Sequence, residues 1–391
     1  MCRAIVFHLK NYFLFRQIRK AKSSYITQRF EDFDFFQFRN AGKNFLETKR
    51  CGSSPYMYKV SESATMPTLY GSAYACMTLD LFGEIDRYSE EERLSWCSYF
   101  NSFQSSESGL FHDLVIKDDP HYDSDWWGAR HLALHMISAY ASLGSKPKYP
   151  FYFLKKYYGS KGIENWLDGF DWIAGPKSIE NDIDNQIMNI GCLLQYQRDV
   201  WNDIEAGLAV DRLKNYLRQK ILSSTGLWGE FDDTNALQRS RVVQFAYHLM
   251  PIFFYDNDYE FDYRKIVICV LKTQNKFDGF GAKFNSSACE DIDSIYLLLN
   301  FRKMCSPKLQ CQIDDSLSRA YSWILFNKNN DNGFVFRMFE ELMYGHAETS
   351  MLKNESGLFP TWFRILSIAQ IDKVIGHRRF VLKRTPGYNV I

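Results

Sequence analysis

Residues 278–299 read DGFGAKFNSSACEDIDSIYLLL and contain both features that decide the fold. A glycine turn with an aromatic residue, Gly279-Phe280, comes first, and a short polar loop then leads into an apolar helix. Comparable glycines follow amphipathic segments along the chain, at Gly52, Gly109, Gly169, Gly226, Gly279 and Gly333. Successive glycines are 57, 60, 57, 53 and 54 residues apart. A nearly fixed period of this size indicates stacked supersecondary units.

Each unit of the repeat is expected to contain two helices. The amphipathic segments before the glycines are predicted to be outer helices, at 34–49, 90–104, 151–167, 206–222, 260–275 and 312–327. The segments after the glycines are apolar on nearly every side, which marks buried inner helices, at 67–82, 126–143, 182–200, 239–254, 291–304 and 360–371. Pro67 and Pro360 fit the first turn of a helix. Six such pairs predict an all-α protein, an (α/α)6 toroid whose inner helices begin around one central cavity.

Composition supports one globular domain. The chain has 391 residues, a formal net charge of +1 and 46% hydrophobic residues, which excludes a disordered or fibrous protein. The near-zero charge does not favour a nucleic-acid partner. The nine cysteines lack CxxC or zinc-finger spacing, which indicates small buried side chains in a reducing compartment, the cytoplasm. No run of 18 apolar residues is present in the sequence, so no membrane span is predicted.

We expect the toroid to occupy residues 34–372, with a polar insert at 329–358. The N-terminal extension, 1–33, mixes aromatic and basic residues. It suits either a packing helix or a peripheral contact with an acidic membrane surface. A basic C-terminal tail, 373–391, contains His377, Arg378, Arg379, Lys383 and Arg384.

The unit at 278–299 resembles the glycine–aromatic repeat of squalene–hopene-type class II terpenoid cyclases and of protein prenyltransferase β-subunits. The resemblance implies an (α/α)6 toroid that acts on an isoprenoid. Where these cyclases have a DxDD motif, this chain has Asp291-Ile292-Asp293-Ser294. The resemblance therefore implies that Asp293 is the catalytic acid that protonates an alkene or epoxide and that Asp291 supports it. The last acidic position of the motif is Ser294, which departs from the family pattern.

The prenyltransferases bind a zinc ion at the same point of the repeat, with a later histidine. By this resemblance Asp291, Asp293 and His346 are candidates for a divalent metal site, although a carboxylate-rich set favours harder ions than zinc. His346 is also a candidate catalytic residue. His131 and His135 are one helical turn apart, but the apolar residues around them favour packing over metal binding.

The first turns of the inner helices are expected to face one pocket. Candidate substrate-binding residues are Trp126, Trp127, Arg130, His131, Asp184, Arg239, Arg241, Tyr344, Trp362 and Arg364. An arginine at a helix N-terminus opposes the helix dipole, so the arginines at 239, 241 and 364 are expected to bind an anionic or hydroxyl-rich ligand. For Asp182 and Asp291 the alternative is helix capping.

Aromatic, acidic and arginine side chains together suit two classes of small-molecule substrate. An isoprenoid would place its chain or a carbocation against the aromatic faces. A saccharide would stack on the aromatic rings and use the polar groups for acid–base cleavage, as in a glycan hydrolase, lyase or epimerase. The third alternative is a non-catalytic binding toroid. Of these, the resemblance favours the isoprenoid enzyme.

The insert 329–358 is long for a connector and contains Tyr344, His346 and Glu348 beside Gly345. Loops over cavities commonly exclude water when a ligand binds. We therefore predict a lid over the mouth of the barrel that brings His346 to Asp291 and Asp293; the alternative is a solvated loop with no role.

Overall fold

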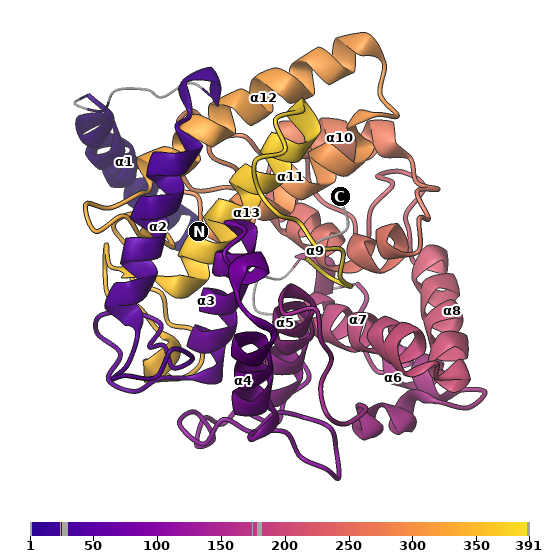
Figure 1. The fold of residues 1–391 in the computed structure, drawn as a ribbon. Helices are drawn as coiled ribbons and strands as arrows, with labels where there is room; N and C mark the ends of the chain where they lie inside the picture. Colours follow the sequence, from indigo (N-terminus) through magenta and orange to yellow (C-terminus); the bar gives the residue numbers. More distant parts are fainter. Residues whose placement is uncertain (1, 24, 26–29, 174, 178–181, 389–391) are drawn as a thin grey trace.

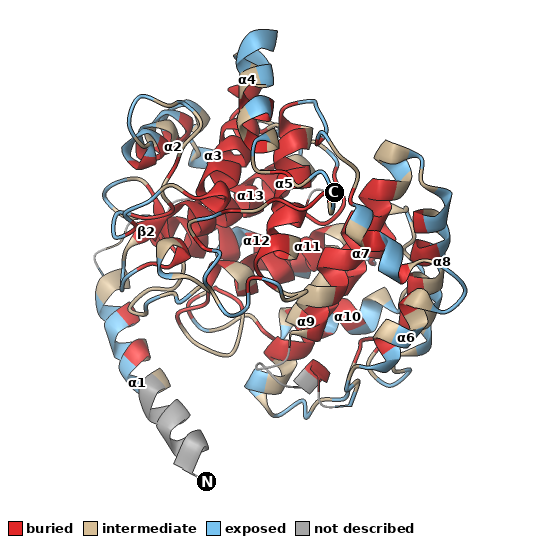
Figure 2. Cartoon of the chain, turned by 90° about the horizontal axis from the view of Figure 1, so that it is seen from below, coloured by how far each residue is buried: buried red, intermediate tan, exposed pale blue. Residues whose placement is uncertain are grey.

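The computed structural model describes residues 2–23, 25, 30–173, 175–177 and 182–388, with side chains from residue 11 onward. An inner ring is formed by α3 (Leu69–Leu81), α5 (Ala129–Ser142), α7 (Ile183–Trp201), α9 (Ala236–Tyr255), α11 (Ala288–Arg302) and α13 (Leu358–Ile375). Each of these helices packs against the next, and α13 packs against α3, so the ring is closed. Buried residues dominate them (Figure 2).

The second layer surrounds this ring (Figure 1). It consists of α2 (Phe35–Lys49), α4 (Glu90–Asn101), α6 (Gly162–Asp168), α8 (Ile204–Gln219), α10 (Tyr263–Leu271) and α12 (Pro307–Phe326). These helices are amphipathic: in α8, Leu213 and Leu217 are buried while Asp211 is exposed. The predicted all-α (α/α)6 toroid is therefore confirmed.

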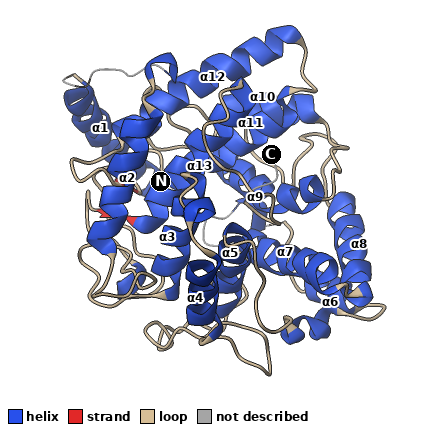
Figure 3. Ribbon diagram, viewed as in Figure 1, coloured by secondary structure: helices blue, strands red, loops and turns tan. Residues whose placement is uncertain are grey.

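The remaining elements are short (Figure 3). Strand β1 (Phe334–Val335) pairs antiparallel with β2 (Ser356–Gly357), with Phe334 opposite Gly357. The 3-10 helices are η1 (Phe30–Asp32), η2 (Ile85–Arg87), η3 (Tyr152–Tyr157), η4 (Gly175–Lys177) and η5 (Ala347–Thr349).

Isolated β-bridges explain why the glycine–aromatic pattern repeats. An aromatic residue one or two positions after the glycine pairs with a residue near the end of the outer helix, in the pairs Gln104–Phe111, Ile221–Trp228, Gln274–Phe280 and Lys328–Phe334. These four aromatic side chains are fully buried. Gly109 and Gly226 adopt positive φ angles of 78° and 71°, a conformation that glycine enters without steric cost. The pattern therefore reverses the chain between the outer and the inner helix.

Two sequence expectations need correction. The predicted outer helix at 151–167 is η3 followed by α6. Gly159 between them has a φ of +76°, which cannot continue a right-handed helix. Pro67 lies outside α3, because Thr68 is the N-cap and accepts a hydrogen bond from the Gly71 N–H. Pro360 does lie in the first turn of α13.

The N-terminal extension contains α1 (Cys2–Lys22), whose second half packs on the outside of the toroid. Ile18 is fully buried in a cluster with Phe277, Trp323 and Phe326. Lys22 Nζ lies 3.2 Å from the Asp278 carboxylate at the glycine turn. Among the described residues, no helix is long and apolar enough to cross a membrane. The peripheral membrane contact stays a prediction.

The basic tail is part of the barrel. The Val381 N–H donates to the Leu81 carbonyl at the end of α3, and Lys383 Nζ donates to the Ser142 carbonyl at the end of α5. Arg384 Nη2 donates to the Tyr255 carbonyl at the end of α9. The tail therefore crosses the C-terminal ends of the inner helices, and in Figure 1 it runs toward the centre of the ring.

Candidate active site

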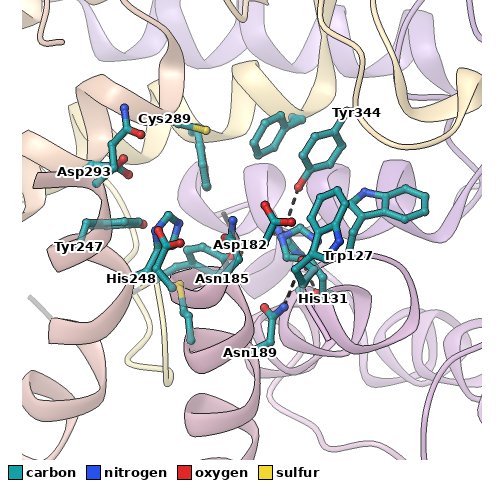
Figure 4. A pocket seen from close by; sticks show the side chains of 18 of the residues that line it. Trp127, His131, Asp182, Asn185, Asn189, Tyr247, His248, Cys289, Asp293 and Tyr344 are labelled. Atoms are coloured by element: carbon teal, nitrogen blue, oxygen red, sulfur yellow. Dashed lines mark hydrogen bonds and ion pairs between the residues drawn. The ribbon is translucent and has the colours of Figure 1, made fainter. Parts of the chain in front are cut away.

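A cavity of about 220 Å³ lies inside the ring, among the N-terminal halves of the inner helices. It is about the size of a small molecule. Helices α5, α7, α9, α11 and α13 contribute side chains, together with Trp126 and Trp127 before α5, Tyr344 from the insert and Tyr388 from the tail. Figure 4 shows these side chains converging on one space. The remaining lining residues are His131, His135, Asp182, Asp184, Asn185, Met188, Asn189, Arg241, Gln244, Tyr247, His248, Cys289, Asp293, Phe359 and Phe363.

Asp293 lines the cavity from the second turn of α11 and is 2% exposed. Its Oδ2 atom is buried and has no hydrogen-bond partner. Burial, together with the negative charges of Glu290 and Asp184, raises the pKa of Asp293 well above its ordinary value. This environment favours the protonated form of the carboxyl group.

Asp291 lies on another side of α11 and does not line the cavity. Its oxygens accept hydrogen bonds from Arg364 Nη1 at 2.8 Å and from Trp323 Nε1 at 3.1 Å. They also accept from the Phe280 N–H and the Ser286 hydroxyl. This carboxylate joins the glycine turn to α12 and α13, so its observed contacts are structural. The N-cap of α11 is Ser287, in a capping box with Glu290, so Asp291 does not cap the helix either.

The second carboxylate in the cavity is Asp184, on the first turn of α7. Arg241 from α9 donates to both of its oxygens, at 2.6 and 2.7 Å, and His248 Nδ1 lies 2.8 Å from Oδ2. Burial alone would raise the pKa of Asp184, but the Arg241 guanidinium and His248 outweigh it and hold that pKa well below its usual range. Asp184 is therefore ionised, and its charge is balanced by Arg241.

Two neutral histidines lie next to the aromatic wall. His135 Nδ1 donates to the His131 carbonyl at 2.9 Å, so its Nε2 accepts from the Tyr388 hydroxyl at 3.2 Å. Burial lowers the pKa of His135 to about 4. His131 is hydrogen-bonded to Tyr70 at Nδ1 and to Tyr344 at Nε2, and burial lowers its pKa well below the ordinary value. These rings pack in the wall without carrying charge at neutral pH.

Seven Trp, Tyr and Phe side chains form part of the wall. Tyr344 stacks on Phe359 with ring centroids 4.9 Å apart and an interplanar angle of 15°. Trp127 stacks on Tyr70 of α3, which forms a second layer behind the cavity. The indole Nε1 of Trp127 and the hydroxyl of Tyr247 are buried without hydrogen-bond partners. These groups could donate to an oxygen of a bound ligand.

Seven of the predicted site residues line the cavity, and six do not. The seven are Trp126, Trp127, His131, Asp184, Arg241, Asp293 and Tyr344. Asp291 and five others lie elsewhere: Arg130 pairs with Asp125, Arg239 with Asp233, Arg364 with Asp291, His346 with Asp118, and Trp362 packs behind the wall. Of the three arginines expected to bind a ligand, Arg241 lines the cavity and Arg239 and Arg364 do not, and each has a carboxylate partner within the protein.

The insert contributes one described side chain to the cavity wall, that of Tyr344. Glu348 pins the insert by accepting hydrogen bonds from Thr65 and from the Met66 N–H, just before α3. His346 Nε2 lies 3.2 Å from the Asp118 carboxylate and does not line the cavity. The prediction that the insert brings His346 to Asp291 and Asp293 is therefore wrong, because the turn at Gly345 directs Tyr344 inward.

The predicted metal site is also corrected. Within the described part of the chain, no group of three or more His, Cys, Asp or Glu side chains is arranged to hold a metal ion. Asp291 is already bound by Arg364, the surroundings of Asp293 raise its pKa, and His346 pairs with Asp118.

Sequence reasoning missed several lining residues. Some missed residues lie on the same helix face as predicted ones. On α7, Met188 follows Asp184 at helical spacing, and on α9, Gln244 and His248 follow Arg241 in the same way. That signal was available in the sequence. Phe359, Phe363, Tyr247, Cys289, Asn185 and Asn189 lie among residues that are equally compatible with a core. Tyr388 follows the last helix and has no local signal at all.

Neither a family model nor a curated protein matches this sequence. Solved structures with a similar arrangement include a type II terpene cyclase from Scytonema, solved with its substrate geranylgeranyl dihydroxybenzoate. It is 12% identical, with 87% of this chain and 98% of that chain covered and a TM-score of 0.49. The GH76 α-mannanase of Bacteroides thetaiotaomicron is 12% identical, covering 88% of this chain and 96% of that chain, with a TM-score of 0.47. A polysaccharide lyase is 9% identical, covering 87% and 97%, with a TM-score of 0.46.

Proposed function

We propose that this chain is an enzyme that opens and cyclises an oxygen-bearing isoprenoid, with Asp293 as the catalytic acid. One observation carries the proposal: a buried carboxyl group without a hydrogen-bond partner lies in a cavity with seven Trp, Tyr and Phe side chains in its wall. The sequence had suggested a cavity with several free charges of both signs. Arg239, Arg364 and Asp291 lie outside the cavity and Asp184 is balanced by Arg241, so fewer free charges face a ligand than the sequence suggested.

The raised pKa of Asp293 limits which functional groups of a substrate it can protonate. A carboxylic acid with a raised pKa is a weak proton donor, so the accepting group must be a better base than an alkene. An epoxide oxygen meets this requirement. The Asp293 proton passes to the epoxide oxygen, the carbon–oxygen bond breaks with its electron pair remaining on that oxygen, and a neighbouring alkene supplies the electrons of the new carbon–carbon bond. Loss of a proton from the resulting cation ends the reaction.

The aromatic wall suits the cation formed in this step. The negative faces of Trp, Tyr and Phe rings attract a positive charge, and the attraction is strongest where water is excluded. Trp127 and Tyr247 could position the oxygen through their unpartnered donors. Arg241 is held by Asp184, which disfavours a substrate whose diphosphate would need that guanidinium.

A panel of substrates tests this proposal. The native protein is incubated with an epoxide-terminated linear sesquiterpene, with its parent alkene and with linear prenyl diphosphates, and products are identified by mass spectrometry. We expect cyclic products from the epoxide alone and none from Asp293→Asn, which keeps the shape but has no acidic proton. Turnover of the diphosphates, or equal turnover by Asp293→Asn, would contradict the assignment.

A glycan-active enzyme is the second candidate, and it rests on a different observation. Two carboxyl groups in one cavity, Asp293 and Asp184, have pKa values shifted in opposite directions, as in acid–base pairs that cleave glycosidic bonds. In such a pair Asp293 would act as the acid and the ionised Asp184 as the base. This candidate predicts a rise in melting temperature with acidic oligosaccharides and none with isoprenoids. A binding toroid without activity predicts ligand affinity that survives Asp293→Asn and no product from any panel.

A further inference from the structure

The basic residues of the tail complement the charge at the end of the barrel that they cover. All inner helices point the same way, so their C-terminal carbonyls meet at the end opposite the cavity mouth. Unpaired carbonyls at a helix end carry partial negative charge and favour cations. Lys383 Nζ donates to the Ser142 carbonyl of α5 and also pairs with Asp80 at 2.7 Å. Arg384 donates to the Tyr255 carbonyl at the end of α9. These contacts hold the tail across the ring.

Beyond Arg384 the tail turns into the barrel. Residues 385–388 are buried. Gly387 has a φ of +96°, and a Cβ atom there would lie 3.2 Å from Leu134 Cδ1 of α5 and 3.6 Å from Met188 Cε of α7. Because a side chain at this position would be strained, glycine lets the chain pass close to these two helices.

Tyr388 then fills the centre of the ring. Its ring centroid lies 5.0 Å from that of Trp362 and 5.2 Å from that of His135. The hydroxyl donates to the neutral His135 Nε2, and Gln370 Nε2 donates to the Tyr388 carbonyl. These two hydrogen bonds fix the orientation of the Tyr388 side chain. Tyr388 lines the cavity that contains Asp293.

We infer that Tyr388 is the floor of the cavity and sets the length of the substrate that fits above it. The inference rests on the proposed isoprenoid function and adds a specificity-determining residue to it. The walls around the floor come from ring helices, whose packing leaves little freedom. Tyr388 comes from a tail segment instead. Removal of its ring should therefore lengthen the cavity toward the closed end of the barrel, because the helices cannot collapse fully into the space.

Binding of linear isoprenoid alcohols measures this depth. Dissociation constants are determined for the native protein, Tyr388→Ala and Tyr388→Phe with geraniol, farnesol and geranylgeraniol. In Tyr388→Ala we expect the affinity for the longest alcohol relative to the shortest to rise about tenfold or more, because additional methylenes become buried. Tyr388→Phe keeps the ring and loses only the hydroxyl, so the length preference should stay native. An unchanged preference in Tyr388→Ala would overturn the inference.

A second measurement separates this inference from the proposed function. If the native protein binds none of the three alcohols, the isoprenoid proposal is contradicted. Crystal structures of the native protein and of Tyr388→Ala then test whether Tyr388 forms the floor of the cavity. We expect the vacated space to be continuous with the cavity; closure of that space by Trp362 or Phe363 would overturn the inference. If Tyr388→Ala does not fold, Tyr388→Leu replaces it in both experiments, since a leucine retains part of the packing and still shortens the floor.

Discussion

Arg364 Nη1 lies 2.8 Å from Asp291 Oδ2, and both side chains are completely buried between α11 and α13. Because of this ion pair, the two carboxyl groups of the Asp291-Ile292-Asp293 motif have different roles. Asp291 is bound by the protein and Asp293 is left for a ligand. The arginine also donates to the Val335 and Phe336 carbonyls, so it fastens the start of the insert to the ring.

Breaking this pair should destabilise the protein. We expect Arg364→Ala to lower the free energy of unfolding by about 3–5 kcal/mol, because Asp291 would remain buried without its charged partner. Urea denaturation measures the change. The double variant Arg364→Met with Asp291→Asn removes both charges and should recover part of the loss. A single variant as stable as the native protein would show that the pair is not required.

The raised pKa of Asp293 predicts a specific pH dependence of stability. A carboxyl group whose pKa is raised in the folded state favours folding while it is protonated. Its stabilising contribution is fully present below the ordinary aspartate pKa and is lost as the pH rises toward the folded-state pKa. Asp293→Asn cannot ionise, so its melting temperature should exceed the native value at pH 8, and the difference should shrink toward pH 4. An opposite trend would mean that Asp293 is ionised.

The insert should act through Tyr344 and not through His346. Tyr344→Ala removes a wall of the cavity and its stacking on Phe359, so we expect at least about tenfold weaker farnesol binding. His346→Ala disrupts a contact with the exposed Asp118 and should leave the dissociation constant within about twofold of native. Calorimetric titration of both variants measures the effect. An equal loss of farnesol affinity in the two variants would show that His346 also contributes to the site.

The fold was predictable because it depends on local signals that repeat. The glycine turns, the amphipathic outer segments and the apolar inner segments each recur six times, and an error at one copy, such as the segment at 151–167, does not change the number of helix pairs. The site depends on helix rotation. Asp291 and Asp293, like Arg239 and Arg241, are two residues apart on a helix and therefore face different sides. Only one member of each pair can line the cavity.

Other site residues could not be predicted from local patterns. Arg364 is 73 residues from the aspartate that holds it, and nothing near it in the sequence indicates a carboxylate partner. Tyr388 lies in a tail whose only recognised sequence feature was its positive charge. Its role follows from where the inner helices end, which requires the closed ring to be known.

We predict that Asp293 carries a proton inside the cavity at neutral pH, and infrared spectroscopy tests this without any ligand. A protonated carboxyl group has a carbonyl stretching band distinct from the carboxylate bands. In the difference spectrum between the native protein and Asp293→Asn at pH 7, we expect a protonated-carboxyl band that is present only in the native protein. Loss of carboxylate bands instead, with no protonated-carboxyl band, would show an ionised Asp293 and contradict the account.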